Sequence, residues 1–99
     1  MPRINSEELG RWRAVDAAAT LTALANYAKR DQTFKPIKEG STTRWNVTVQ
    51  GRDFELLLTG TKFFDTRAKK GGGGAVDLAI YLLRVDFKTA TGILRRCGL

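Results

Sequence analysis

Apolar residues recur at helical spacing near the N-terminus of the chain. A short helix is expected over about residues 5–13, with Asn5 or Ser6 as its N-cap. A stronger helical pattern begins at Asp16 and continues through an alanine-rich segment to about Lys29. The N-terminal part of the chain is therefore expected to be mostly helical.

The helical period returns in the last quarter of the chain. One helix is expected over about residues 75–83, and Asp86 can cap a second one. The apolar side of this last helix would consist of Phe87, Ala90, Leu94 and Cys97. Cys97 is expected to be buried as a small apolar residue, and Gly98 is a natural stop after it.

Between the helical segments, apolar and polar residues alternate with a period of two, which is typical of strands. The expected strands cover residues 45–49, 53–59 and 61–65. Gln50–Gly51 and Gly60 supply tight turns between them. Three short strands joined by tight turns predict an antiparallel meander. The chain is therefore expected to be a small α+β domain, in which about three strands pack with an N-terminal helix and two C-terminal helices.

Composition sets the size and the class of the protein. A chain of 99 residues with 42% apolar and 27% charged residues is typical of one soluble globular domain. We expect residues 1–15 to form an N-terminal extension and residues 16–99 to form the domain. No apolar run approaches the roughly 20 residues that span a bilayer, and the N-terminus lacks the apolar core of a secretory signal. A cytoplasmic protein without membrane contact is therefore expected.

Positive charge is gathered in clusters along the chain. The formal net charge is +7, from 17 Lys and Arg residues and 10 Asp and Glu residues. The clusters consist of Lys62, Arg67, Lys69 and Lys70; of Lys29, Arg30, Lys35 and Lys38; and of Arg3, Arg11 and Arg13 around Trp12. Such clusters favour a polyanionic partner. For Lys29 and Arg30, a solvated helix C-terminus and a phosphate contact are equally open.

Four consecutive glycines, residues 71–74, lie between Lys69–Lys70 and the start of a helix. Exposed backbone N–H groups at a helix N-terminus suit phosphate. A nucleotide-binding P-loop is disfavoured because no Gly-Lys-Ser/Thr follows, and the dinucleotide fingerprint would need a parallel βαβ unit. Two interpretations stay open: the glycines permit an unusual backbone path between sheet and helix, or they contact phosphate.

The aromatic residues divide into core and surface candidates. Phe63 and Phe64 are adjacent on an expected strand, so their side chains point to opposite faces. One ring should be in the core, and the other is a candidate for stacking on a base beside the cations. The sequence does not decide which is exposed. Trp45 is expected in the core, whereas Trp12, between two arginines, suits either base stacking or anchoring of the N-terminal helix.

Residues for catalysis or metal binding are scarce. The chain has no histidine and a single cysteine, which excludes a Cys/His zinc site and a histidine base. Asp53 and Glu55 share a strand face but lack further oxygen ligands for Mg²⁺. Asp77 is best explained as a carboxylate that stabilises the first turn of its helix. We therefore expect no enzymatic activity, no metal and no cofactor.

The second half of the chain resembles a known family. The run from Phe63 to Leu78, followed by Val85-Asp86-Phe87-Lys88-Thr89-Ala90, is similar to the N-terminal zinc-binding domain of bacterial and phage DNA primases. In that family, an aromatic strand leads into a Cys-x-x-Cys knuckle, a glycine-rich turn and a helix. The resemblance covers roughly residues 16–97 and is strong over residues 62–90.

The resemblance lacks the metal ligands of the family. Thr66 and Lys69 stand where the Cys-x-x-Cys pair would be, and the earlier ligands are missing around residues 44–48. The chain therefore resembles a zinc-free derivative of the primase zinc ribbon. Apolar packing would have to replace the metal, with Trp45, Phe54 and Leu56–Leu58 as natural fillers.

The resemblance implies a binding module for single-stranded DNA with little sequence specificity. It would assist a primase, polymerase, helicase or relaxase in replication of a plasmid, phage or other mobile element. The alternative is a protein-interaction adaptor of such an element that has lost DNA binding. The candidate nucleic-acid-binding residues are Lys62, Phe63, Phe64, Arg67, Lys69, Lys70, Gly71, Gly72, Arg44, Lys29, Arg30, Lys35, Lys38 and Trp12.

Overall fold

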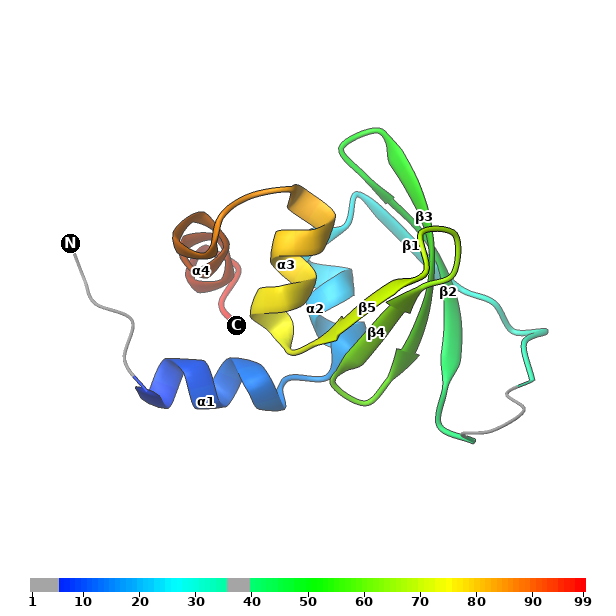
Figure 1. Cartoon of the computed structure of the whole chain (residues 1–99), viewed down its shortest axis with the longest axis horizontal. Coiled ribbons are helices and arrows are strands. Elements are labelled where there is room, and N and C mark those ends of the chain that lie inside the picture. The colour runs from blue at the N-terminus through cyan, green and yellow to red at the C-terminus, as the bar shows by residue number, and fades with distance from the viewer. Residues whose placement is uncertain (1–5, 36–39) are drawn as a thin grey trace.

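The computed structural model describes residues 6–35 and 40–99 of the chain. Their helices and strands are α1 (Ser6–Ala14), α2 (Ala17–Leu24), β1 (Tyr27–Arg30), β2 (Thr43–Val49), β3 (Arg52–Thr59), β4 (Lys62–Asp65), β5 (Lys70–Gly73), α3 (Ala75–Leu83) and α4 (Phe87–Arg96). The helices form one layer and the sheet the other (Figure 1). The predicted α+β class is confirmed.

The sheet is an antiparallel meander with the strand order β1-β2-β3-β4-β5. The three predicted strands are β2, β3 and β4, and the two edge strands were not predicted. The hairpin at Gln50–Gly51 is confirmed, because both residues have the positive φ angles, 51° and 78°, of a two-residue hairpin turn.

Strand β1 replaces the end of a predicted helix. The helix that was expected to reach Lys29 ends at Leu24, and Ala25 already has an extended backbone. Beyond it, the Asn26 side chain accepts a hydrogen bond from the Gln50 backbone N–H at 2.8 Å, and β1 pairs with β2. The interpretation of Lys29 and Arg30 as a helix C-terminus is therefore wrong, because pairing with a distant strand outweighs the local helical preference.

Strand β5 consists mainly of glycines because two phenyl rings lie against it. Phe63 pairs with Gly72, and Phe64 pairs with Gly71, on opposite faces of the sheet. A Cβ atom on Gly72 would approach the Phe63 ring to 3.1 Å. A Cβ atom on Gly71 would approach the Phe63 carbonyl oxygen to 2.8 Å and the Phe64 ring to 3.1 Å. The glycines thus leave room for the aromatic rings of β4, and they form strand β5 themselves.

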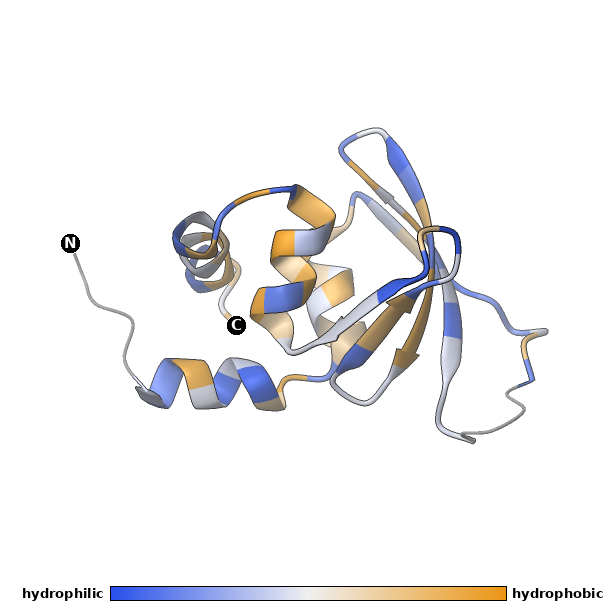
Figure 2. Cartoon of the chain, in the orientation of Figure 1, coloured by the Kyte–Doolittle hydropathy of each residue, from blue (hydrophilic) through white to orange (hydrophobic). Residues whose placement is uncertain are grey.

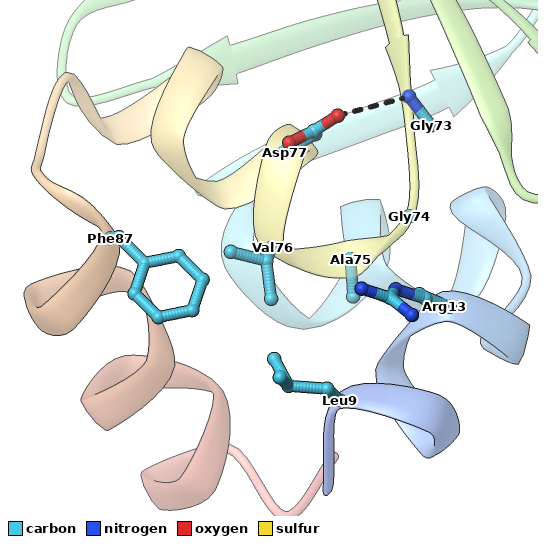
Figure 3. Close-up of a pocket in the computed structure, with 8 residues that line it drawn as sticks. All are labelled: Leu9, Arg13, Gly73, Gly74, Ala75, Val76, Asp77 and Phe87. Atoms are coloured by element: carbon cyan, nitrogen blue, oxygen red, sulfur yellow. Dashed lines mark hydrogen bonds between the residues drawn. The ribbon is translucent and has the colours of Figure 1, made fainter. Parts of the chain in front are cut away.

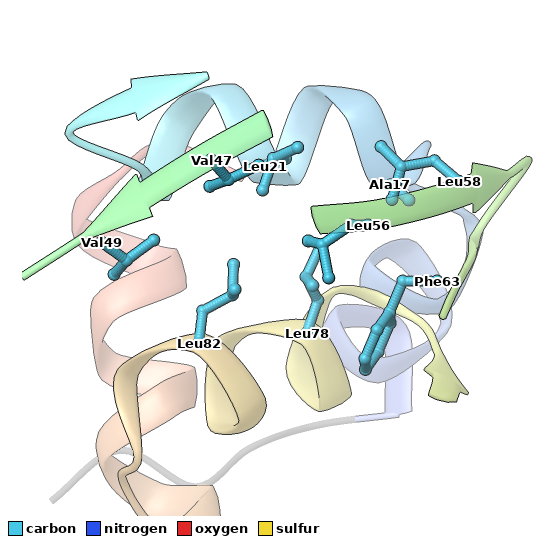
Figure 4. Close-up of a cluster of buried hydrophobic side chains, with 9 residues drawn as sticks. All are labelled: Ala17, Leu21, Val47, Val49, Leu56, Leu58, Phe63, Leu78 and Leu82. Carbon is cyan, nitrogen blue, oxygen red and sulfur yellow. The ribbon is translucent and has the colours of Figure 1, made fainter. Parts of the chain in front are cut away.

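The main core lies between the inner face of the sheet and helices α2 and α3. It is formed by Ala17, Leu21, Val47, Val49, Leu56, Leu58, Phe63, Leu78 and Leu82 (Figure 4). Alternate residues of β2 and β3 point into it, as the period of two requires. The apolar residues of β3 and α3 are visible as orange segments in Figure 2. No helix in the described part of the chain is long and apolar enough to cross a membrane.

A second core joins α1 to α3 and α4. Trp12 is fully buried there, together with Ala75, Ala79, Ala90 and Leu94. The small alanines leave room for the indole ring. At the other end of α1, Arg95 on α4 donates two hydrogen bonds of 2.7 Å to the Glu8 carboxylate. Trp12 therefore anchors the N-terminal helix, and its interpretation as a base-stacking residue is wrong because the ring has no exposed face.

Three further aromatic and sulfur-containing residues are more exposed than expected. Cys97 is exposed, because α4 ends at Arg96 and Cys97 follows it as the C-cap residue. Phe87 at the start of α4 is 46% exposed. Trp45 is half-buried at the margin of the main core, and its indole N–H donates to the Thr43 hydroxyl at 2.9 Å. The predicted cap is confirmed: the Asp86 carboxylate accepts from the Thr89 N–H at 2.8 Å.

Candidate nucleic-acid interface

The outer face of the sheet is the face opposite the helices (Figure 1). The alternation along β4 turns Phe63 inward, where it is 6% exposed, and Phe64 outward, where it is 41% exposed. Phe64 is therefore the stacking candidate that the sequence left undecided. Phe63 belongs to the main core, so its interpretation as a contact with nucleic acid is wrong.

A hollow of about 450 Å³ adjoins the Phe64 ring. It is lined by Thr42, Leu57, Thr59, Lys62, Phe63, Phe64 and Gly72. Leu57 and Phe64 are paired across β3 and β4 and give it an apolar floor. The Thr42 and Thr59 hydroxyls share a hydrogen bond of 2.7 Å at its polar end, and the exposed Lys62 supplies positive charge. This combination suits a flat aromatic group attached to a phosphate.

The turn after β4 is held by a buried carboxylate. Asp65 is 5% exposed and accepts hydrogen bonds from the backbone N–H groups of Arg67 at 2.9 Å and Ala68 at 3.1 Å. Its second oxygen accepts a hydrogen bond from the Tyr81 hydroxyl on α3. Burial of the phenol and this hydrogen bond raise the pKa of Tyr81 to about 12. The Asp65 carboxylate thus holds the turn through hydrogen bonds. The sequence had predicted that apolar packing would take the place of a metal here.

The same turn presents the predicted cationic cluster to solvent. Arg67, Lys69 and Lys70 are all exposed there, while the Thr66 hydroxyl donates to the Glu55 carboxylate at 2.9 Å. Lys69 has a φ of 56°, in the left-handed region that favours glycine. A lysine therefore occupies this position at a cost in backbone energy of roughly 1 kcal/mol.

The second predicted cluster lies at the opposite edge of the sheet. Lys29 and Arg30 are exposed on β1, and Lys35 is exposed beyond it, while Lys38 is outside the described residues. Arg44 on β2 is engaged by Asp31, which accepts its Nε–H at 2.9 Å, and by the Phe34 ring at 5.4 Å. Hydrogen bonds from Thr33 and Arg44 lower the pKa of Asp31 to about 2.

Two carboxylates interrupt the outer face between these cationic regions. Asp53 and Glu55 both project from β3, where Thr48 donates to Asp53 at 2.7 Å. Their charge disfavours the passage of a phosphate backbone over the middle of the sheet. Among the described residues, no group of three or more Asp, Glu, Cys or His side chains could hold a metal ion.

A second hollow, of about 280 Å³, lies on the helical side of β5 (Figure 3). It is lined by Leu9, Arg13, Gly73, Gly74, Ala75, Val76, Asp77 and Phe87. Gly74 precedes α3 without a side-chain cap, and Arg13 points toward this helix end. Asp77 accepts a hydrogen bond from the Gly73 N–H at 3.4 Å and so occupies the first turn, as predicted. This hollow is separated by β5 from the Phe64 ring.

The structure brings part of the predicted site together. Phe64 and Gly71 are direct partners in the β4–β5 hairpin, with Lys62 toward its open end and the turn after Asp65 at its other end. Tyr27 is an interface candidate that sequence reasoning missed. It is 53% exposed and shares the outer face, because its partner on β2 is Thr48. The predicted helix over this segment concealed the alternation that places it there.

Comparisons of the chain with models of protein families, with curated proteins and with solved structures found no match. The geometry of the outer face is therefore the basis for assigning a function.

Proposed function

We propose that the protein binds single-stranded DNA on the outer face of the sheet. The observation that carries this proposal is the Phe64 ring, which is exposed against the side-chain-free Gly71 and flanked by Lys62. Stacking of one base on an aromatic ring contributes about 1–3 kcal/mol to binding of a single strand. A duplex would not benefit, because its bases are already stacked on one another.

The charges indicate a path along the β4–β5 hairpin. Phosphates would contact Lys62 and the exposed cations Arg67 and Lys69 of the turn. Lys70 is also exposed, but it pairs with the inward-facing Asp65 and projects from the helical face of the sheet. This path avoids the carboxylates in the middle of the sheet. The Gly74 N–H donates to the Thr61 carbonyl, and hydrogen-bonded and non-hydrogen-bonded pairs alternate along the β4–β5 ladder. The Gly71 N–H therefore points away from β4 and is a further donor on the path.

The proposal extends to the setting that the primase resemblance implies. The protein would act in the cytoplasm as an accessory to a primase, polymerase, helicase or relaxase of a plasmid, phage or other mobile element, without catalytic activity of its own. The resemblance of residues 62–90 supports this setting, and the stacking face and cations of that segment support the binding role.

One observation favours the alternative role as a protein-interaction adaptor. Strand β5 is an edge strand whose Gly71 turns its backbone groups away from β4, whereas the Gly73 N–H already donates to Asp77. Such an edge can accept an extended segment of a partner protein as a sixth strand. An adaptor that binds in this way would not use the exposed Phe64 ring. Its affinity for the partner would not need to depend on salt.

A titration with labelled oligothymidylate of about 12 nucleotides, followed by fluorescence anisotropy, tests the proposal. We expect the single strand to bind at about 50 mM salt and its affinity to fall steeply as the salt concentration rises. The reason is that Lys and Arg side chains displace counterions from the phosphates of the DNA backbone. A matched duplex should bind more weakly. Absence of binding at micromolar protein and low salt would contradict the proposal and favour the adaptor.

The Lys69→Gly variant separates the two roles of the turn. Glycine relieves the left-handed backbone, so the free energy of unfolding should stay unchanged or rise by up to about 1 kcal/mol. Affinity for the single strand should fall, with the slope of log affinity against log salt reduced by about 0.7 for one lost phosphate contact. Chemical denaturation and salt titration measure the two effects. Unchanged affinity and slope would show that Lys69 does not contact the strand.

A further inference from the structure

A second hollow of the outer face lies at the end of the sheet away from the Phe64 pocket. It measures about 250 Å³, and its lining includes Tyr27, Asn46, Thr48, Asp53 and Arg67. Tyr27, Thr48 and Asp53 are directly opposite one another on β1, β2 and β3, so their side chains form one row. The exposed Tyr27 lies at the β1 end of the row, and the exposed Arg67 is also part of the lining.

We propose that this hollow is a subsite for one guanine of the bound strand, with Asp53 as the residue that reads it. This proposal rests on the proposed function of the outer face. Thr48 donates to Oδ1 of Asp53 at 2.7 Å, and no other hydrogen bond or ion pair of this carboxylate exists within the described part of the chain. Oδ2 is therefore available as an acceptor in the same row as Tyr27, which lies two strands away on β1.

Guanine fits an ionised carboxylate better than the other DNA bases. Its Watson–Crick edge presents two adjacent donors, the N1–H and the N2 amino group. Adenine and cytosine each place a ring-nitrogen lone pair beside their amino group, and thymine flanks its single N–H with two carbonyl oxygens. A carboxylate repels these acceptors, so Asp53 selects for guanine by attraction and against the other bases by repulsion.

The subsite also explains why the negatively charged Asp53 lies on a surface that is proposed to bind a polyanion. A base over Asp53 keeps the phosphates toward the rim, where Arg67 is available to them. Asp53 is four residues along β3 from Leu57, the partner of Phe64, so the two subsites are about 13 Å apart. One strand of about four or more nucleotides can reach both.

The experiment compares three labelled oligonucleotides on the full chain: oligothymidylate, the same sequence with one central guanine, and the same with one central inosine. Inosine keeps the N1–H and lacks the N2 amino group. We expect the guanine oligonucleotide to bind about tenfold more tightly than oligothymidylate, with inosine between them. In Asp53→Asn the preference should disappear, while affinity for oligothymidylate stays equal or rises with the lost negative charge. Tyr27→Ala should weaken the guanine oligonucleotide most.

The outcomes separate this inference from the proposed function. If oligothymidylate fails to bind, the outer face does not bind single-stranded DNA and both proposals fail. If it binds and guanine, inosine and thymine give equal affinities, the proposed function stands and the guanine subsite is refuted. A guanine preference that persists in Asp53→Asn would refute the assignment of Asp53. Both side chains are exposed, so unchanged thermal unfolding confirms that either variant reports on binding.

Discussion

Phe63→Ala is expected to lower the free energy of unfolding by about 3–5 kcal/mol, whereas Phe64→Ala should lower it by less than about 1 kcal/mol. The two rings are neighbours in sequence and lie on opposite faces of β4. Phe63 packs in the main core, and the centroid of its ring lies 5.5 Å from that of the Tyr81 ring. Truncation of Phe63 would therefore leave a cavity. Phe64 is exposed, and its truncation removes contacts with Leu57 and Gly71 at the surface.

Binding should show the reverse order. Phe64→Ala should weaken single-strand binding by about 1–3 kcal/mol, which is roughly 5- to 150-fold, and should leave the salt dependence unchanged. Phe64→Tyr keeps a stacking face and is expected to restore most of the affinity. Denaturant unfolding and anisotropy titrations measure the two effects on the same samples. Equal loss of stability in both alanine variants, with no loss of affinity in Phe64→Ala, would remove Phe64 from the interface.

Trp12→Ala is expected to destabilise the protein by about 3–5 kcal/mol, a large share of the total stability of a domain of this size. The indole is fully buried against alanines of α3 and α4, so its loss would leave a cavity between α1 and these two helices. Its Nε1–H has no hydrogen-bond partner in the described structure. Trp12→Phe keeps an apolar ring without this N–H and should therefore cost clearly less than the alanine variant.

The neighbouring Arg13 supplies a control on the same helix. Its side chain is exposed, so Arg13→Ala should change the free energy of unfolding by about 0.5 kcal/mol or less. Thermal and chemical unfolding measure the series. Native-like stability of Trp12→Ala would mean that α1 contributes little to the fold and that the remaining layers are stable without it.

Elements with a strong local period could be predicted from the sequence. The strands at residues 45–49 and 53–59 alternate cleanly, and the helix at residues 75–83 keeps its apolar spacing, so each was found close to its true bounds. Strands β1 and β5 have no such period. Alanine-rich and glycine-rich segments become strands here because they pair with β2 and β4, and that pairing depends on residues distant in the sequence.

The candidate interface was partly predictable for the same reason. The aromatic pair and the cations of the β4–β5 hairpin are contiguous in sequence, so their proximity needed no knowledge of the fold. The choice between Phe63 and Phe64 required the register of β4. Tyr27 could not be placed on the same face without knowledge of β1. The role of Asp65 in holding the turn could not be predicted either, because its partner Tyr81 lies on α3, 16 residues further along the chain.

The two oxygens of the Asp65 carboxylate connect the layers of the molecule. One holds the backbone of the cationic turn, and the other holds helix α3 on the inner side of the sheet. Opening of the turn and fraying of α3 therefore break contacts of the same side chain. A ligand that orders the turn is therefore expected to restrict both motions, so that binding on one side of the sheet would change the dynamics on the other.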